Sequence, residues 1–214
     1  MKALSQIEQI KCQQLANAID ERLHLHPKIK EAFANIKREL FVPLGFKHHA
    51  YKLDALPIAG NQWISSPLTV AKMTQALDPV GADSVLEIGC GSGYQAAILS
   101  QIVRRVFTIE RIERLVIEAK QRFKELGIHN IHVRYADGML GWREFAPYER
   151  ILFSAAITEV PQNIVDQLKD GGILVAPIIT KKGQVITKYV KKGNILEKGE
   201  IDTCLFIDSK RGVE

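Results

Sequence analysis

The sequence predicts a doubly wound α/β domain with N-terminal helices and an antiparallel C-terminal edge. Between residues 84 and 179, short apolar runs alternate with segments of helical periodicity. Such alternation is typical of a parallel sheet with helices on both faces. A glycine-rich stretch directly follows the first apolar run, and after residue 181 the pattern changes to short alternating runs broken by glycines. This last pattern indicates antiparallel strands joined by turns.

The first 80 residues predict helices around an irregular segment. Apolar residues recur at helical spacing over 4–22 and 27–39, and Pro27 stands at a favourable first-turn position. Residues 41–66 carry no regular period and predict a long ordered loop with short strands. Loops of that length in compact domains are usually functional. Residues 67–77 predict another helix.

The central part supplies the sheet. We expect strands at 84–89, 105–110, 131–136, 150–156 and 172–179, and helices at 94–103, 112–127 and 159–170. The whole chain of 214 residues fits a single domain in three parts. These are a helical extension (1–80), an α/β core (81–180) and antiparallel C-terminal strands (181–214).

Composition excludes several classes of protein. No apolar run approaches the roughly 18 residues of a membrane helix, so we expect no membrane partner. Three cysteines, odd in number and far apart, argue against a disulfide framework and favour the cytoplasm. The net charge of +5 is spread over both flanks without a basic stripe, so we expect no nucleic-acid partner. The histidines show no third ligand at metal spacing, so we expect no metal.

Three glycines within five residues, Gly89, Gly91 and Gly93, occupy the first strand–helix turn. Glycine permits positive φ and removes the Cβ atom that would keep a ligand away from the backbone. In open parallel sheets, ligands bind beyond the carboxyl ends of the strands. The loop therefore predicts a nucleotide-like ligand, with a purely structural turn as the alternative.

The spacing of the loop disfavours a dinucleotide. The dinucleotide fingerprint is G-x-G-x-x-G, whereas here the spacing is G-x-G-x-G and Tyr94 stands in place of the last glycine. Glu87 would also lie close to a pyrophosphate, where a further negative charge is unfavourable. The same carboxylate suits a ligand with an ammonium or a sulfonium group.

Acids after the next two strands complete this pattern. Glu110 lies 21 residues after Gly89, the distance at which an acid accepts hydrogen bonds from ribose hydroxyls. Asp137-Gly138 can place a carboxylate beside the exocyclic amine of an adenine. Taken singly, Glu110 could be a surface acid paired with Arg111 or Arg114, and Asp137-Gly138 could be only a turn. Together they fit S-adenosylmethionine, an adenosine that carries cationic groups.

Several segments resemble the protein-L-isoaspartate O-methyltransferase family, bacterial type. They are "RELFVP", "AYKLDALPI", "QWISSPLTVAKMTQAL", "VLEIGCGSGYQAAIL", "DGMLGW", "EVPQ" and "LKDGGILVAPI", between about Lys37 and Ile178. The resemblance implies a Rossmann-like methyltransferase fold that binds S-adenosylmethionine. It also implies methyl esterification of the free α-carboxylate of L-isoaspartyl residues in damaged proteins, leading to repair through a succinimide. Isoaspartyl proteins and peptides would be the partners, and we expect a monomer.

The resemblance also implies the site residues. The family's active-site serine falls on Ser65, as an orienting hydroxyl, and Ile64 and Ser65 would line the methyl-transfer site. The cofactor positions fall on Glu87, Gly89, Gly91, Ser92, Gly93, Glu110, Arg111, Asp137 and Gly138. Ser65 or Ser66 before Pro67 could instead be a helix N-cap, and both roles can coexist. Trp63, where the family has threonine, and the tail around Phe206 depart from the family pattern.

Three alternatives stay open at this point. Another S-adenosylmethionine enzyme could act on RNA or a small molecule, although the chain has no aromatic-prolyl motif for base methylation. A nicotinamide-dependent oxidoreductase is disfavoured by Tyr94 and Glu87. A non-catalytic relative would bind cofactor without turnover.

Overall fold

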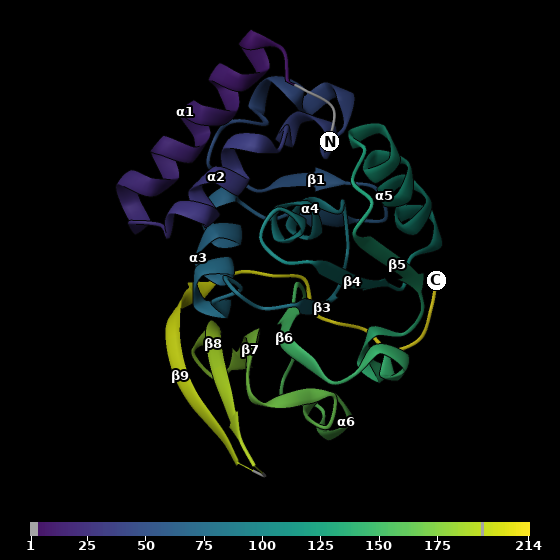
Figure 1. The fold of residues 1–214 in the computed structure, drawn as a ribbon. Helices are drawn as coiled ribbons and strands as arrows, with labels where there is room; N and C mark the ends of the chain where they lie inside the picture. Colours follow the sequence, from purple (N-terminus) through teal and green to yellow (C-terminus); the bar gives the residue numbers. More distant parts are fainter. Residues whose placement is uncertain (1–3, 194) are drawn as a thin grey trace.

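The computed structural model describes residues 4–193 and 195–214, and its centre is a seven-stranded sheet (Figure 1). The strand order is β5-β4-β3-β6-β7-β8-β9. The bounds are β3 Ser84–Ile88, β4 Arg105–Glu110, β5 Ile131–Tyr135, β6 Tyr148–Phe153, β7 Leu168–Thr180, β8 Gly183–Lys192 and β9 Ile195–Cys204. Strands β3 to β7 pair in parallel, and β8 and β9 pair antiparallel. The predicted doubly wound sheet with an antiparallel C-terminal edge is therefore confirmed.

The helices and short strands precede the core or connect its strands. The α-helices are α1 Gln6–Leu23, α2 Pro27–Asn35, α3 Pro67–Leu77, α4 Tyr94–Ser100, α5 Glu113–Leu126 and α6 Gln162–Val165. Short 3₁₀ helices span η1 Arg38–Leu40, η2 Leu44–His49, η3 Gly138–Leu140 and η4 Arg143–Phe145. The irregular segment 41–66 also contains a small hairpin, β1 Leu56–Ile58 and β2 Gln62–Ile64. This agrees with the prediction of an ordered loop with short strands.

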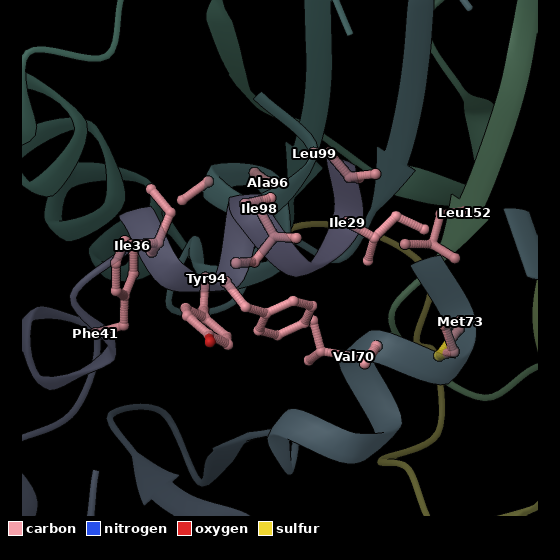
Figure 2. Packing of buried hydrophobic residues seen from close by; sticks show 14 of the residues in the cluster. Ile29, Ile36, Phe41, Val70, Met73, Tyr94, Ala96, Ile98, Leu99 and Leu152 are labelled. Atoms are coloured by element: carbon pink, nitrogen blue, oxygen red, sulfur yellow. The ribbon is translucent and has the colours of Figure 1, made fainter. Parts of the chain in front are cut away.

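The two faces of the sheet are covered unequally. Alternate strand residues point to opposite faces, so Val85 and Leu152 join the larger core cluster while Leu86 joins the smaller. The larger cluster contains side chains from α1 to α5, and Figure 2 shows part of it around Tyr94 and Val70. The other face packs against α6, η3 and η4, all of them short. Helical elements therefore cover both faces, but long helices gather on one.

Two predicted helices are shorter than expected. Residues 159–170 predicted one helix, but α6 has only four residues, since Leu168 already pairs with Tyr148 in the sheet. Pairing with β6 satisfies backbone groups that a longer helix would have used internally. The helix predicted over 27–39 ends at Asn35, because Ile36 is extended (φ −108°, ψ 118°) and η1 follows.

The last ten residues, 205–214, form a tail that leaves β9 and returns across the sheet. Figure 1 shows this segment in yellow, running from β9 past the ends of β3 and β4. Backbone hydrogen bonds join Ala156 to Ile207 and Ser209 at 2.9 and 2.7 Å. The N–H of Glu214 donates to the carbonyl of Arg111 at 2.7 Å. The tail thus lies over the carboxyl ends of the parallel strands.

Candidate active site

A cavity of about 600 Å³ opens at the carboxyl ends of β3, β4 and β6. Its walls come from the loop after β3, the β2–α3 junction and the tail. The size falls within the range of small-molecule and cofactor pockets. Nine of the eleven predicted site residues line it: Ile64, Ser65, Glu87, Gly89, Gly91, Ser92, Glu110, Arg111 and Gly138.

The three loop glycines all have positive φ, at 96°, 55° and 89° for Gly89, Gly91 and Gly93. At Gly91 an added Cβ would meet only Ile58 Cδ1, at 4.0 Å, so bare backbone faces open space. This is the arrangement that lets a ligand approach the main chain. The prediction of a loop that lies against a ligand therefore has a structural basis at Gly91.

Gly93 has a different role from the one its position predicted. It is absent from the cavity wall, and an added Cβ would lie 2.6 Å from Phe123 Cζ on α5. Gly93 also precedes the first residue of α4. The missing side chain here allows close packing of α4 against α5.

Glu87 is fully buried, and its carboxyl group accepts two hydroxyl hydrogen bonds. Thr108 Oγ1 donates to Oε2 at 2.6 Å, and Ser154 Oγ donates to Oε1 at 3.0 Å. Burial raises the pKa of Glu87 to about 8, although both hydroxyls act in the opposite direction. A cationic group placed beside this carboxyl would lower that pKa again. The site therefore favours a ligand with positive charge, as the sequence predicted.

Glu110 is not a surface acid, since its exposed fraction is only 6%. Its Oε2 accepts the N–H of Gly91 at 2.8 Å, and its Oε1 accepts the N–H groups of Arg111 and Ile112. The carboxylate therefore fixes the glycine loop relative to the end of β4. Oε2 retains a free lone pair at the cavity wall, which can accept a hydroxyl hydrogen bond.

Asp137 does not line the cavity, although its neighbour Gly138 does. Its Oδ1 accepts the N–H of Met139 at 2.9 Å, and its Oδ2 accepts the N–H of Gly212 at 2.8 Å. Arg111 also holds the tail, through an ion pair of 2.8 Å with Glu214. The two residues predicted to bind cofactor thus anchor the tail that crosses the site.

The two serines before Pro67 divide the roles that the sequence left open. Ser66 is the N-cap of α3, because its Oγ accepts the N–H of Thr69 at 3.1 Å. Ser65 is half-buried and lines the cavity, so its hydroxyl is available to a ligand. Trp63 lines the same cavity with 56% of its surface exposed. Trp63 and Ser65 therefore line the same cavity as the glycine loop.

Sequence reasoning did not single out several residues of this site. Ser154 follows β6 at the carboxyl edge of the sheet, and that position was the signal that could have identified it. Thr108 is hidden inside an apolar strand pattern, so no signal marked it. The tail residues 205–210 also line the cavity. Phe206, one of the departures from the family pattern, is among them.

The described residues contain neither a cluster of metal ligands nor a membrane-spanning helix. Nowhere in 4–193 and 195–214 do three or more His, Cys, Asp or Glu side chains gather in a way that could hold a metal ion. In the same ranges, no helix is both long enough and apolar enough to cross a membrane.

The donor set of the cavity fits S-adenosylmethionine. The buried carboxyl group of Glu87, hydrogen-bonded to two hydroxyls, lines the same cavity as the bare backbone at Gly91. The carboxylate of Glu110, which accepts the N–H of Gly91, lines it as well. The hydroxyl of Ser65 faces the same space. The site can thus hold a cationic adenosine and orient a second molecule beside it.

Comparisons with known proteins agree with this geometry. A curated relative named protein-L-isoaspartate O-methyltransferase, from Helicobacter pylori (strain P12), is 55% identical over 206 residues, which are 96% of this chain and 99% of the relative. A solved structure of the same name is 29% identical with a TM-score of 0.84, covering 92% of this chain and 65% of that one.

A Plasmodium falciparum structure in complex with S-adenosyl-L-homocysteine has a TM-score of 0.80 and covers 93% of this chain and 98% of that one. At 19% identity it shows a shared fold. The family model described as protein-L-isoaspartate(D-aspartate) O-methyltransferase matches residues 9–212. The chain therefore belongs to the protein-L-isoaspartate(D-aspartate) O-methyltransferase family.

Proposed function

We propose that this protein transfers the methyl group of S-adenosylmethionine to the free α-carboxylate of L-isoaspartyl residues in damaged proteins. The main support for this proposal is that the Ile64-Ser65 segment and the glycine loop line one cavity. The Ile64-Ser65 segment, specific to the family, faces the glycine loop at Gly91 across a shared space. Family membership over residues 9–212 supports the same reaction. The methyl ester then loses methanol to form a succinimide, part of which reopens to normal aspartate.

The acceptor needs no general base. An α-carboxylate with a pKa of about 3.5–4 is already ionised at neutral pH. When bound, S-adenosylmethionine supplies an electrophilic methyl group on a sulfonium. The Ser65 hydroxyl donates a hydrogen bond to the incoming carboxylate and orients one of its oxygens for in-line attack. The contribution of Ser65 is therefore alignment.

Exclusion of water is the second contribution of the protein. The tail crosses the cavity through residues 205–210, and Trp63 covers the wall beside Ser65. A displacement in which cation and anion neutralise each other is favoured when water is removed from both. Glu87, held by Thr108 and Ser154, would bind the ammonium group of the cofactor.

The reaction is tested with two peptides of identical sequence, one isoaspartyl and one aspartyl. The protein is incubated with each peptide and with S-adenosylmethionine labelled in its methyl group. We expect a base-labile label in the isoaspartyl peptide alone. Binding of S-adenosylhomocysteine without label in either peptide would overturn the substrate assignment and favour a non-catalytic relative. Label in both peptides would overturn the selectivity.

We further propose that isoaspartyl proteins and peptides, not nucleic acids, are the partners, and that the working unit is a monomer in the cytoplasm. The modest net charge of +5 and the absence of a basic stripe from the sequence support the first point. The three cysteines, all free thiols, support a reducing compartment. Light scattering coupled to size exclusion tests the oligomeric state, and a mass of about 48 kDa, twice the 24.0 kDa of the chain, would contradict it.

A further inference from the structure

Arg38 is completely buried behind the wall that carries Ser65. It lies in η1, and its guanidinium group donates only to backbone carbonyls. Nη1 donates to Ala50 O at 2.7 Å, and Nη2 donates to Asp54 O at 2.9 Å and to Ser65 O at 3.1 Å. One side chain therefore joins the segment 50–54 to Ser65, a residue of the cavity wall.

The same guanidinium contacts the helix that follows the glycine loop. Its Cζ lies 5.6 Å from the centre of the Tyr94 ring, a cation–π distance. Tyr94 packs against Phe33 and Phe41, and Figure 2 shows it among the side chains of the larger core. Arg38 thus connects the Ser65 segment with the start of α4, and both line the cavity.

Arg38 forms no direct ion pair within the described part of the chain. Asp54 accepts a hydrogen bond through its carbonyl oxygen, and its exposed carboxylate attracts the guanidinium without contact, which partly opposes the lowering of the Arg38 pKa by burial. An isolated buried charge is costly, and proteins usually pair it. A cation retained in this state remains available to an anion that binds on the other side of the wall.

We propose that Arg38 is a positioning residue for the acceptor, which fixes the Ser65 backbone and favours an ionised substrate carboxylate through a buried charge that no carboxylate of the described residues contacts directly. This inference rests on the proposed function, since it concerns the carboxylate that would be methylated. Because the guanidinium donates to the Ser65 carbonyl, a carboxylate beside Ser65 Oγ would lie on the order of 10 Å from it. At an effective dielectric constant of about 20, a charge at that distance changes affinity roughly ten- to thirtyfold.

The experiment separates charge from shape. It measures the inhibition constants of an isoaspartyl peptide and of its neutral α-carboxamide analogue, together with kcat, KM and the affinity for S-adenosylhomocysteine. Wild type is compared with Arg38→Gln, which keeps two N–H donors without charge, and Arg38→Lys, which keeps the charge without the fork. Arg150→Gln is the matched control, because Arg150 donates to the carbonyls of Asp78 and Glu149 and lies outside the cavity wall.

We expect wild type to bind the carboxylate peptide at least tenfold more tightly than the carboxamide. Arg38→Gln should lose most of this preference. Arg38→Lys should keep it and should lower kcat severalfold, because an ammonium cannot hold both Asp54 and Ser65 in place. Affinity for S-adenosylhomocysteine should change less than threefold in every variant, and Arg150→Gln should match wild type.

Two outcomes would overturn the proposal. One is equal affinity of the wild-type protein for the carboxylate and carboxamide peptides. This comparison does not depend on whether any variant folds. The other is an Arg38→Gln protein that keeps the preference, or that loses cofactor affinity and peptide affinity to the same extent, as a general structural defect would. Failure of the proposed function is distinguishable, since wild type would then bind cofactor and methylate neither the isoaspartyl nor the aspartyl peptide.

Discussion

The carboxylate of Asp137 accepts the backbone N–H of Gly212 at 2.8 Å and thereby ties the end of β5 to the tail. Gly212 has a φ of 76°, which proline cannot adopt. The neighbouring ion pair between Arg111 and Glu214 holds the same segment. Because residues 205–210 of the tail line the cavity, anchoring of the tail and retention of the cofactor are expected to be linked.

Gly212→Pro tests this link. The substitution removes the N–H donor and forces a different φ, so the end of the tail should detach. We expect dissociation of S-adenosylhomocysteine to become severalfold faster in stopped-flow measurements. Val213→Ala is the control, because Val213 is exposed and the change leaves every backbone N–H in place. Equal dissociation rates in all three proteins would show that the tail does not retain the cofactor.

The buried Glu87 predicts a pH dependence of stability. Its pKa rises from 4.5 to about 8 on folding, so between these values the folded state holds a proton that the unfolded state has lost. Stability of the ligand-free protein should therefore fall as pH rises from about 5 to 8, by at most about 1.4 kcal/mol per pH unit. Urea unfolding at several pH values measures this slope. Glu87→Gln should flatten this slope. If the free energy of unfolding of Glu87→Gln fell as steeply with pH as that of wild type, Glu87 would be ruled out as the cause.

The same group predicts proton release on cofactor binding. A cationic amino group beside Glu87 would lower its pKa, so binding at pH 6.5 should release between about half and one proton. Isothermal titration of S-adenosylhomocysteine in two buffers of different ionisation enthalpy gives the number directly. Glu87→Gln should release none and should bind more weakly. Proton uptake by wild type would contradict the assignment.

Gly93 predicts a large effect of a single methyl group. Gly93→Ala places Cβ 2.6 Å from the Phe123 ring, at a φ of 89° that alanine rarely adopts. We expect a loss of about 2–4 kcal/mol in the free energy of unfolding. Gly199→Ala is the control, because an added Cβ there meets nothing within 4 Å. A Gly93→Ala protein as stable as Gly199→Ala would mean that α4 and α5 are packed less tightly than described.

Ser65 and Ser66 form a matched pair for testing the separation of cap and site. Ser66→Ala removes the N-cap of α3 and should cost about 1 kcal/mol of stability. Its KM for the isoaspartyl peptide should change little. Ser65→Ala should leave stability within about 0.5 kcal/mol and raise KM roughly tenfold, since a hydrogen bond to a charged group is lost. The reverse pattern would assign the substrate contact to Ser66.

The parallel strands, the antiparallel edge and the location of the site followed from local patterns. Apolar runs separated by segments of helical periodicity predict parallel strands. Neighbouring parallel strands must be joined by a crossover connection, which is usually a helix. Gly91, Glu110 and Gly138 each lie at or just after the end of a strand, and parallel strands end at one edge, so their meeting at one cavity was predictable. The single Ser66 cap could be read from Pro67 and the helical pattern behind it.

Contacts between residues distant in sequence were not predictable in the same way. The prediction of a helix over 159–170 was wrong in length, because Leu168 pairs with Tyr148 and its segment forms sheet hydrogen bonds in place of helical ones. Gly93 looked like its neighbours in the loop, and only the position of Phe123, thirty residues away, reveals its packing role. No local signal in the sequence shows which glycine of the loop faces the cavity and which packs against a helix.

The sequence by itself determined the fold class, the cofactor type and the family, because these depend on periodicity and on motifs contained in short segments. Only the tertiary structure decided how the side chains are used. It buries Glu87 between Thr108 and Ser154, commits Asp137 to the tail and places Arg38 behind Ser65. The physical reason is that burial, charge pairing and hydrogen-bond partners depend on what the folded chain brings together across space.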